Sequence, residues 1–175
     1  DSKFMKHYQD QFAHIHLPDK QFQTDYIYYD PNFELDSSLN CVERLLDIHI
    51  KEGRGNSVAM RTFNETWTYQ DLYEKSNQIA HVLVDDLGLV SGNRVLIRSA
   101  NNPMFVACWF AILKAGGIVV ATMPLLREKE LETIVDCAEI SHAFCDIRLE
   151  EALSLVKSPY LKSVCTFDGS NETKS

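Results

Sequence analysis

The chain has 175 residues, of which 45% are apolar and 24% charged, a composition typical of one globular domain or slightly more. Its 25 acidic and 17 basic residues give a net charge of −8 without a long basic run, which argues against general affinity for nucleic acid. Residues 101–126 carry a single charge, Lys114, yet Gly116-Gly117 and β-branched residues follow it. This stretch is therefore interpreted as a buried helix and strand, not a membrane span.

The five cysteines form no C-x-x-C pair, and at least three of them lie in apolar runs. This pattern predicts a reduced, cytoplasmic protein with buried thiols. Residues 1–6 also lack the basic-then-apolar order of a signal peptide.

Residues 1–37 are polar and aromatic without a sustained period, which predicts an extension draped on a larger body. Its aromatic side chains need a partner surface; they are Tyr26, Tyr28, Tyr29 and Phe33. A helix is expected next, capped by Ser38 or Asn40 and ending at Gly53 and Gly55. Its apolar positions are Val42, Leu45, Leu46, Ile48 and Ile50.

A hairpin-like pair of strands is predicted at residues 58–63 and 66–67, joined by Asn64-Glu65. Thr68 then begins the clearest helix, because Thr68 and Asp71 have the spacing of a capping box. One apolar face continues to Leu87, and Gly88 ends the helix.

From Asn93 onward, apolar β-rich runs alternate with helical ones. The strands are expected at 94–99, 118–122, 141–145 and 163–167, and the helices at 103–115, 128–139 and 149–157. This alternation predicts an α/β fold with a partial doubly wound parallel sheet flanked by helices. The expected domain organisation is an extension at 1–37, an α/β subdomain at 38–169 and a polar tail at 170–175. The sheet is expected to continue in further residues.

Two segments carry a family resemblance. Trp67–Leu72 reads W-T-Y-Q-D-L, and Leu113–Gly117 reads L-K-A-G-G. In this order and separation they resemble motifs of the adenylate-forming superfamily, which contains acyl-CoA synthetases, aryl-CoA ligases, luciferases and peptide-synthetase adenylation domains. The intervening Gly92–Val95 and Asn101–Pro103 are similar to two further motifs of the same superfamily. The tract from Leu39 to Gly55 and the run leading to Asp30 look most like benzoate- and 2-aminobenzoate-CoA ligases.

The resemblance implies the N-terminal part of an enzyme that joins a carboxylic acid to ATP and then transfers the acyl group to coenzyme A. The acid would be aromatic or medium-chain, and the full-length enzyme would use ATP, Mg²⁺ and coenzyme A. Such enzymes carry a Ser/Thr/Gly-rich phosphate loop, acidic residues and a lysine on a C-terminal domain, none of which occurs in residues 1–175. The chain alone is therefore expected to be inactive, with the rest of its own chain as its partner.

No catalytic or metal-binding residue is predicted here, because the motif residues cap helices and permit close packing. The weak candidates for cofactor binding are Arg127 and Lys129, where a helix start could attract a coenzyme A phosphate; the alternative is a solvated charged face. His14 and His16 have the spacing of a strand face, but two ligands do not make a metal site.

Two other functions stay open on the sequence. One is a stand-alone aryl-adenylating domain that loads a carrier protein, and the other is a non-catalytic binding module that keeps the ligase fold. A homo-oligomer also stays open, whereas no nucleic acid or membrane partner is expected.

Overall fold

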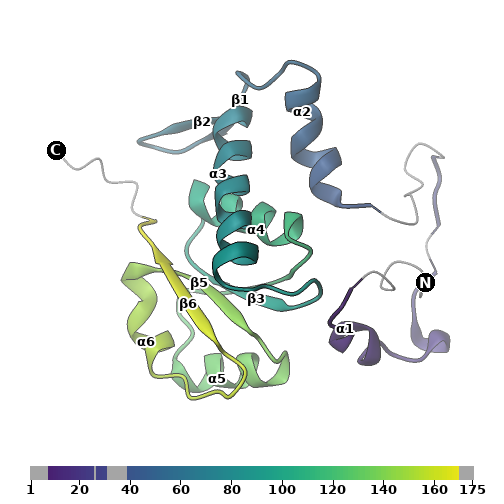
Figure 1. The fold of residues 1–175 in the computed structure, drawn as a ribbon, viewed down its shortest axis with the longest axis vertical. Coiled ribbons are helices and arrows are strands. Elements are labelled where there is room, and N and C mark those ends of the chain that lie inside the picture. Colours follow the sequence, from purple (N-terminus) through teal and green to yellow (C-terminus); the bar gives the residue numbers. More distant parts are fainter. Residues whose placement is uncertain (1–7, 26, 31–38, 170–175) are drawn as a thin grey trace.

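A four-stranded parallel sheet lies at the centre of the fold, in the order β4-β3-β5-β6 (Figure 1). The computed structural model describes residues 8–25, 27–30 and 39–169. The strands are β3 (Arg94–Arg98), β4 (Ile118–Thr122), β5 (His142–Asp146) and β6 (Ser163–Phe167). The helices between them are α4 (Pro103–Lys114), α5 (Glu128–Cys137) and α6 (Glu150–Ser154). The predicted α/β fold with a partial doubly wound sheet is confirmed.

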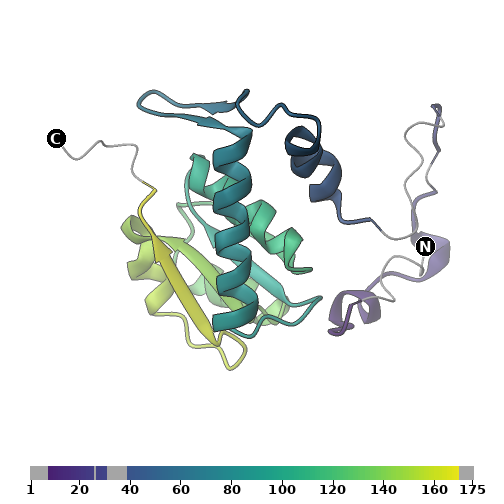
Figure 2. The same cartoon turned by 45° about the horizontal axis from the view of Figure 1, so that its top comes forward.

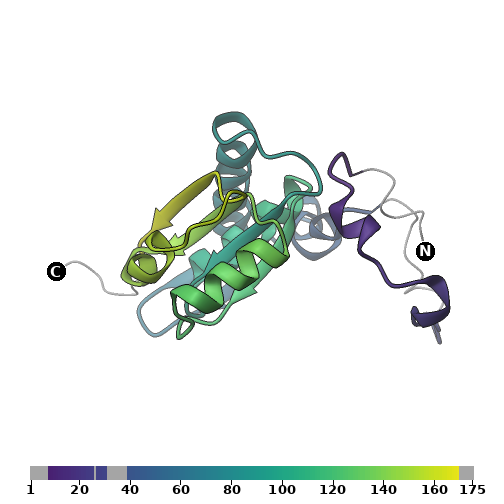
Figure 3. The same cartoon turned by 90° about the horizontal axis from the view of Figure 1, so that it is seen from below.

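Both faces of the sheet are covered, which explains why its central strands are apolar throughout. Val95 and Ile97 of β3 pack with Cys108 and Ile112 of α4 on one face. Leu96 points to the opposite face, where it packs against residues of α5 and α6. Figure 3 shows α5 lying along that second face.

Helix α3 (Tyr69–His81) forms a further layer outside α4, as Figure 2 shows. It begins as predicted, because Thr68 Oγ1 accepts a 3.1 Å hydrogen bond from Asp71 N and Asp71 Oδ2 accepts a 2.8 Å bond from Thr68 N. The expected single helix to Leu87 is divided, since a π-helical segment, η4 (Val82–Asp86), follows α3. Gly88 then ends it at a φ of 66°.

The helix predicted after residue 38 consists of a π-helical segment, η3 (Glu43–Asp47), and α2 (Ile48–Lys51). Asn40 caps it by accepting a 3.1 Å hydrogen bond from Val42 N, whereas Ser38 lies outside the described residues. Val42 and Leu46 are buried, but Leu45 is 57% exposed, so its predicted place on the apolar face was wrong. The π-helical hydrogen bonding changes the angular spacing on which that prediction rested.

The remaining predicted elements are present with slightly different bounds. The hairpin consists of β1 (Val58–Arg61) and β2 (Thr66–Thr68), which pair antiparallel. The helix expected at 149–157 is the turn η5 (Ile147–Leu149) followed by the short α6. The limits at 37 and 169 stay predictions. Among the described residues, no helix is long and apolar enough to cross a membrane.

Lys114 joins the helical layers. Its ammonium Nζ lies 2.8 Å from Asp47 Oδ1, outside hydrogen-bond geometry, and donates a 2.7 Å hydrogen bond to Asn77 Oδ1. It also lies 4.1 Å from the ring centroid of Tyr73. The side chain is only 13% exposed, so these partners compensate for the removal of its charge from water.

The N-terminal segment contains α1 (Phe12–Ile15) and the turn η1 (Lys20–Phe22). Asp10 anchors it to the start of β3, because its carboxylate accepts hydrogen bonds from Asn93 and Arg94 and its N–H donates to Ser91 O. The guanidinium of Arg94 stacks 4.2 Å from the Phe12 ring centroid. Residues 10–12 therefore lie against the start of β3, and the extension at 1–37 as a unit stays a prediction.

The aromatic side chains of this segment are not all covered. Tyr29 is 95% exposed and Tyr28 is 46% exposed. Tyr26 and Phe33 lie outside the described residues. The predicted covering surface for Tyr29 is therefore not supplied by the described part of this chain.

Acid is expected to weaken the Asp10 anchor. Burial raises the pKa of Asp10, but hydrogen bonds from Phe12 N, Arg94 and Asn93 more than offset this, so the pKa lies below its ordinary 3.8. The carboxylate therefore stabilises the fold fully above its unfolded pKa, and this contribution is lost as pH falls through the folded value. Asp10→Asn should cost about 1.5 kcal/mol at pH 7. In urea unfolding at pH 7 and pH 3, the difference between wild type and variant should shrink at pH 3; an equal difference at both would contradict the assignment.

Candidate functional site

Ligands of doubly wound sheets bind beyond the carboxyl ends of the strands, where neighbouring connections leave to opposite faces. Here that point lies between β3 and β5. The chain passes from β3 to α4 on one face and from β5 to α6 on the other. The polar residues around this point are Ser99, Asn102, Asp146 and Arg148.

Asp146 ends β5 and is fully buried. The Arg148 side chain donates two hydrogen bonds to it, 2.9 Å from Nε to Oδ1 and 2.6 Å from Nη2 to Oδ2, and the Arg148 N–H adds a third of 3.0 Å. The side-chain hydrogen bonds from Arg148 lower the pKa of Asp146 although burial raises it. Asp146 is therefore a fixed, ionised partner of Arg148, and its geometry does not suit a general base.

Residues of the chain itself fill the point between β3 and β5 where the connections leave to opposite faces. Asn102 caps α4, where its Oδ1 accepts a 2.8 Å hydrogen bond from Phe105 N and its Nδ2 donates 2.9 Å to Ser99 Oγ. Gly169 packs between Asn102 and Asp146 so closely that a Cβ would lie 2.3 Å from Asp146 Oδ2. Gly169 thus occupies this point two residues after β6 ends, and the polar side chains around it are hydrogen-bonded in pairs, Asn102 with Ser99 and Asp146 with Arg148.

The weak candidates Arg127 and Lys129 lie where α5 begins, at the same carboxyl edge. Both side chains are exposed. Glu130 accepts a 2.7 Å hydrogen bond from Arg127 N, which leaves the guanidinium outside this contact. Within the described residues, neither Arg127 nor Lys129 makes an ion pair. The arrangement leaves two cations available to an anion in solvent.

Arg98 was missed by the sequence reasoning. It ends β3 at this edge, is 2% exposed, and donates hydrogen bonds to four backbone carbonyls. The signal was present, because a charge inside an otherwise apolar strand run must be paired when buried. Arg148 was missed for another reason: nothing local marks it as the partner of a buried Asp146.

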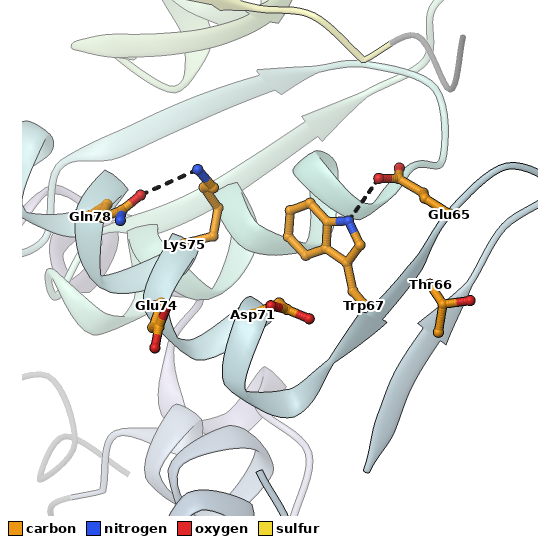
Figure 4. Close-up of a pocket in the computed structure, with 7 residues that line it drawn as sticks. All are labelled: Glu65, Thr66, Trp67, Asp71, Glu74, Lys75 and Gln78. Carbon is orange, nitrogen blue, oxygen red and sulfur yellow. Dashed lines mark hydrogen bonds between the residues drawn. The ribbon is translucent and has the colours of Figure 1, made fainter. Parts of the chain in front are cut away.

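A shallow surface pocket of about 370 Å³ lies beside the hairpin and the first turns of α3 (Figure 4). Trp67 faces it, and its Nε1 donates a 2.8 Å hydrogen bond to Glu65. Three carboxylates and one ammonium line it; these residues are Glu65, Asp71, Glu74 and Lys75. An excess of negative charge makes the pocket unsuitable for a phosphate or a carboxylate.

No group of three or more His, Cys, Asp or Glu side chains in the described part of the chain is arranged to hold a metal. His14 lies in the short helix α1 and His16 directly follows it, so the strand-like spacing expected for them was wrong. His16 Nδ1 lies 2.8 Å from Phe12 O. This local contact fixes the ring against its own turn.

The cysteines are free thiols of two kinds. Burial raises the pKa of Cys108 to about 12 and that of Cys145 to about 11, so neither is a thiolate nucleophile near neutral pH. Cys41 and Cys137 are exposed, which corrects the expectation that the thiols are buried.

The fold and this edge define a member of the doubly wound α/β class, and comparison with known proteins gives its family. Residues 49–174 match the AMP-binding enzyme family. The chain is 34% identical over 79 residues to an uncharacterised acyl-CoA ligase, YtcI, of Bacillus subtilis (strain 168), covering 45% of this chain and 15% of the relative.

Two solved structures of ligases share the fold. The anthranilate CoA ligase AuaEII, in complex with anthranoyl-AMP, has a TM-score of 0.63 at 22% identity, covering 73% of this chain and 25% of that one. A benzoate CoA ligase from Burkholderia xenovorans LB400 has a TM-score of 0.68 at 16% identity, covering 75% and 26%. The chain belongs to the AMP-binding enzyme family, and it spans only 15–26% of the length of these relatives.

Proposed function

We propose that this chain is the N-terminal part of an AMP-forming carboxylic acid–coenzyme A ligase. The observation that carries the proposal is the family match over residues 49–174. Relatives named as acyl-CoA, anthranilate and benzoate CoA ligases support it. The reaction would join the acid to ATP with release of pyrophosphate, after which the thiol of coenzyme A would displace AMP.

The described residues supply scaffold for this reaction. The sheet and its helices would form one wall of the substrate cleft. The phosphate loop and the catalytic lysine would lie in the rest of the polypeptide. ATP, Mg²⁺ and coenzyme A would belong to the full protein. The carboxylic acid is proposed to be aromatic or medium-chain, which the benzoate and anthranilate ligases among the fold's relatives favour.

Arg127 and Lys129 are proposed to contact a phosphate of coenzyme A. Support comes from their exposure, from their place at the start of α5 and from the absence of any ion pair for either within the described residues. A helix start adds the partial positive charge of its free amides. The proposal predicts a higher KM for coenzyme A in the Arg127→Gln/Lys129→Gln double variant of the full protein.

The 175-residue chain alone is expected not to adenylate any acid. A pyrophosphate-exchange assay with benzoate, aminobenzoates and C4 to C12 acids should give the rate of the no-enzyme blank. The reason is that residues 1–175 lack the phosphate loop and the lysine that would neutralise the charge of the triphosphate. The full-length protein in the same assay is the positive control. Exchange by the short chain above the blank would contradict its assignment as scaffold.

The full-length protein should release AMP with at least one acid of that panel when coenzyme A is present. Release with a carrier protein but not with coenzyme A would favour the carrier-loading alternative. No exchange with any acid would favour the non-catalytic module. Activity confined to acids outside the panel would contradict the aromatic or medium-chain assignment.

A further inference from the structure

The buried guanidinium of Arg98 connects the two loops that flank the carboxyl end of β3. Nη1 donates 3.3 Å to Met123 O, and Nη2 donates 3.0 Å to Pro124 O and 2.8 Å to Leu126 O. These three carbonyls belong to the loop between β4 and α5. Nε donates 3.1 Å to Leu149 O, in the turn between β5 and α6.

This arrangement is unusual in its chemistry. Arg98 is 2% exposed and has no carboxylate within ion-pair distance among the described residues. A buried cation without a counter-ion is stable only where several dipoles converge on it. The planar guanidinium satisfies four carbonyls at fixed directions, which an ammonium on a flexible chain cannot reproduce. Arg98 therefore fixes the geometry of the β4–α5 loop and the β5–α6 turn, and the removal of its charge from water opposes this stabilisation.

The same strand offers an internal comparison. Arg94 begins β3 and lies on the same face, four residues before Arg98. It too is buried, and it donates 2.7 Å to Ala138 O and 2.9 Å to Glu139 O at the far end of α5. Arg94 acts at the amino edge of the sheet, away from the edge where ligands of this fold class bind.

We propose that Arg98 is a positioning residue for the coenzyme A step. It holds the β4–α5 loop, and with it the start of α5 that carries Arg127 and Lys129, in register with the β5–α6 turn. This rests on the proposed function. Arg98 itself is only 2% exposed, so its effect on the reaction is transmitted through the backbone carbonyls that it holds.

The test compares Arg98→Lys with Arg94→Lys in the full-length protein. Both variants keep the charge and lose the planar fork. Arg98→Lys is expected to raise the KM for coenzyme A about tenfold while changing the acid-dependent pyrophosphate exchange less than about twofold, since small misplacements of positioned groups cost this much or more. Arg94→Lys should lower the melting temperature without changing that KM. Equal effects of both variants on the KM, or none from Arg98→Lys, would overturn the proposal.

Hydrogen–deuterium exchange of the same variants gives a readout that does not need activity. The amides of Met123, Leu125, Leu126 and residues 147–149 should exchange faster in Arg98→Lys and at an unchanged rate in Arg94→Lys. Unchanged exchange in Arg98→Lys would overturn the proposal. If Arg98→Lys does not fold, Pro124→Gly serves instead, because it loosens the β4–α5 loop and keeps the Arg98 guanidinium. It should raise the KM for coenzyme A in the same way. A wild-type protein that shows no pyrophosphate exchange would instead overturn the proposed function. The hydrogen–deuterium exchange data would then still decide whether Arg98 holds the two loops together.

Discussion

Lys114→Met is expected to destabilise the protein by about 3 kcal/mol, because it leaves the Asp47 carboxylate and Asn77 amide inside the helical layers without their cation. Lys114 contacts Asp47, Asn77 and the Tyr73 ring while only 13% exposed. Asp47 is 22% exposed and has little access to water as a substitute partner. Urea unfolding followed by circular dichroism would measure the change.

A double variant separates the ion pair from simple loss of packing. Lys114→Met/Asp47→Leu replaces both charges by apolar groups and should recover most of the lost stability, since breaking a buried pair costs more than replacing it. Lys51→Met, on the exposed end of α2, is the control and should change stability by less than about 0.5 kcal/mol. A double variant as unstable as Lys114→Met would show that the charge pairing is not the source of the effect.

Gly92→Ala is expected to cost about 3 kcal/mol and to release the N-terminal segment from the start of β3. Gly92 has a φ of 93°, and a Cβ there would lie 2.3 Å from the Asp10 carbonyl oxygen. The backbone conformation alone costs a non-glycine residue about 1–2 kcal/mol. The clash with a backbone oxygen adds to this, because the segment can relieve it only by moving away.

Gly88→Ala is the matched control for this change. Gly88 also has a positive φ, of 66°, but no atom lies within 4 Å of the point that a Cβ would occupy, so only the conformational cost of about 1 kcal/mol is expected. Limited proteolysis should cleave residues 8–16 faster in Gly92→Ala than in Gly88→Ala. Equal stability loss and equal cleavage in the two variants would contradict the close approach of Asp10 as the cause.

The sequence by itself determined the class of fold and the family. Alternation of apolar strands and capped helices is a local property, so the capping box at Thr68, the cap at Asn102 and the strands at 118–122 and 163–167 were predicted with correct or nearly correct bounds. The W-T-Y-Q-D-L and L-K-A-G-G segments indicated the family for the same reason, because they are contiguous and in register.

Only the tertiary structure decided which polar residues share an environment. The local sequence places Arg98 in a strand and indicates nothing about its partners. Its four carbonyl partners lie between 25 and 51 residues away along the chain. Asp10 meets Arg94 across 84 residues, and Asn102 meets Gly169 across the sheet edge. No local period encodes such pairings, since they depend on the strand order β4-β3-β5-β6 and on which loops that order brings together.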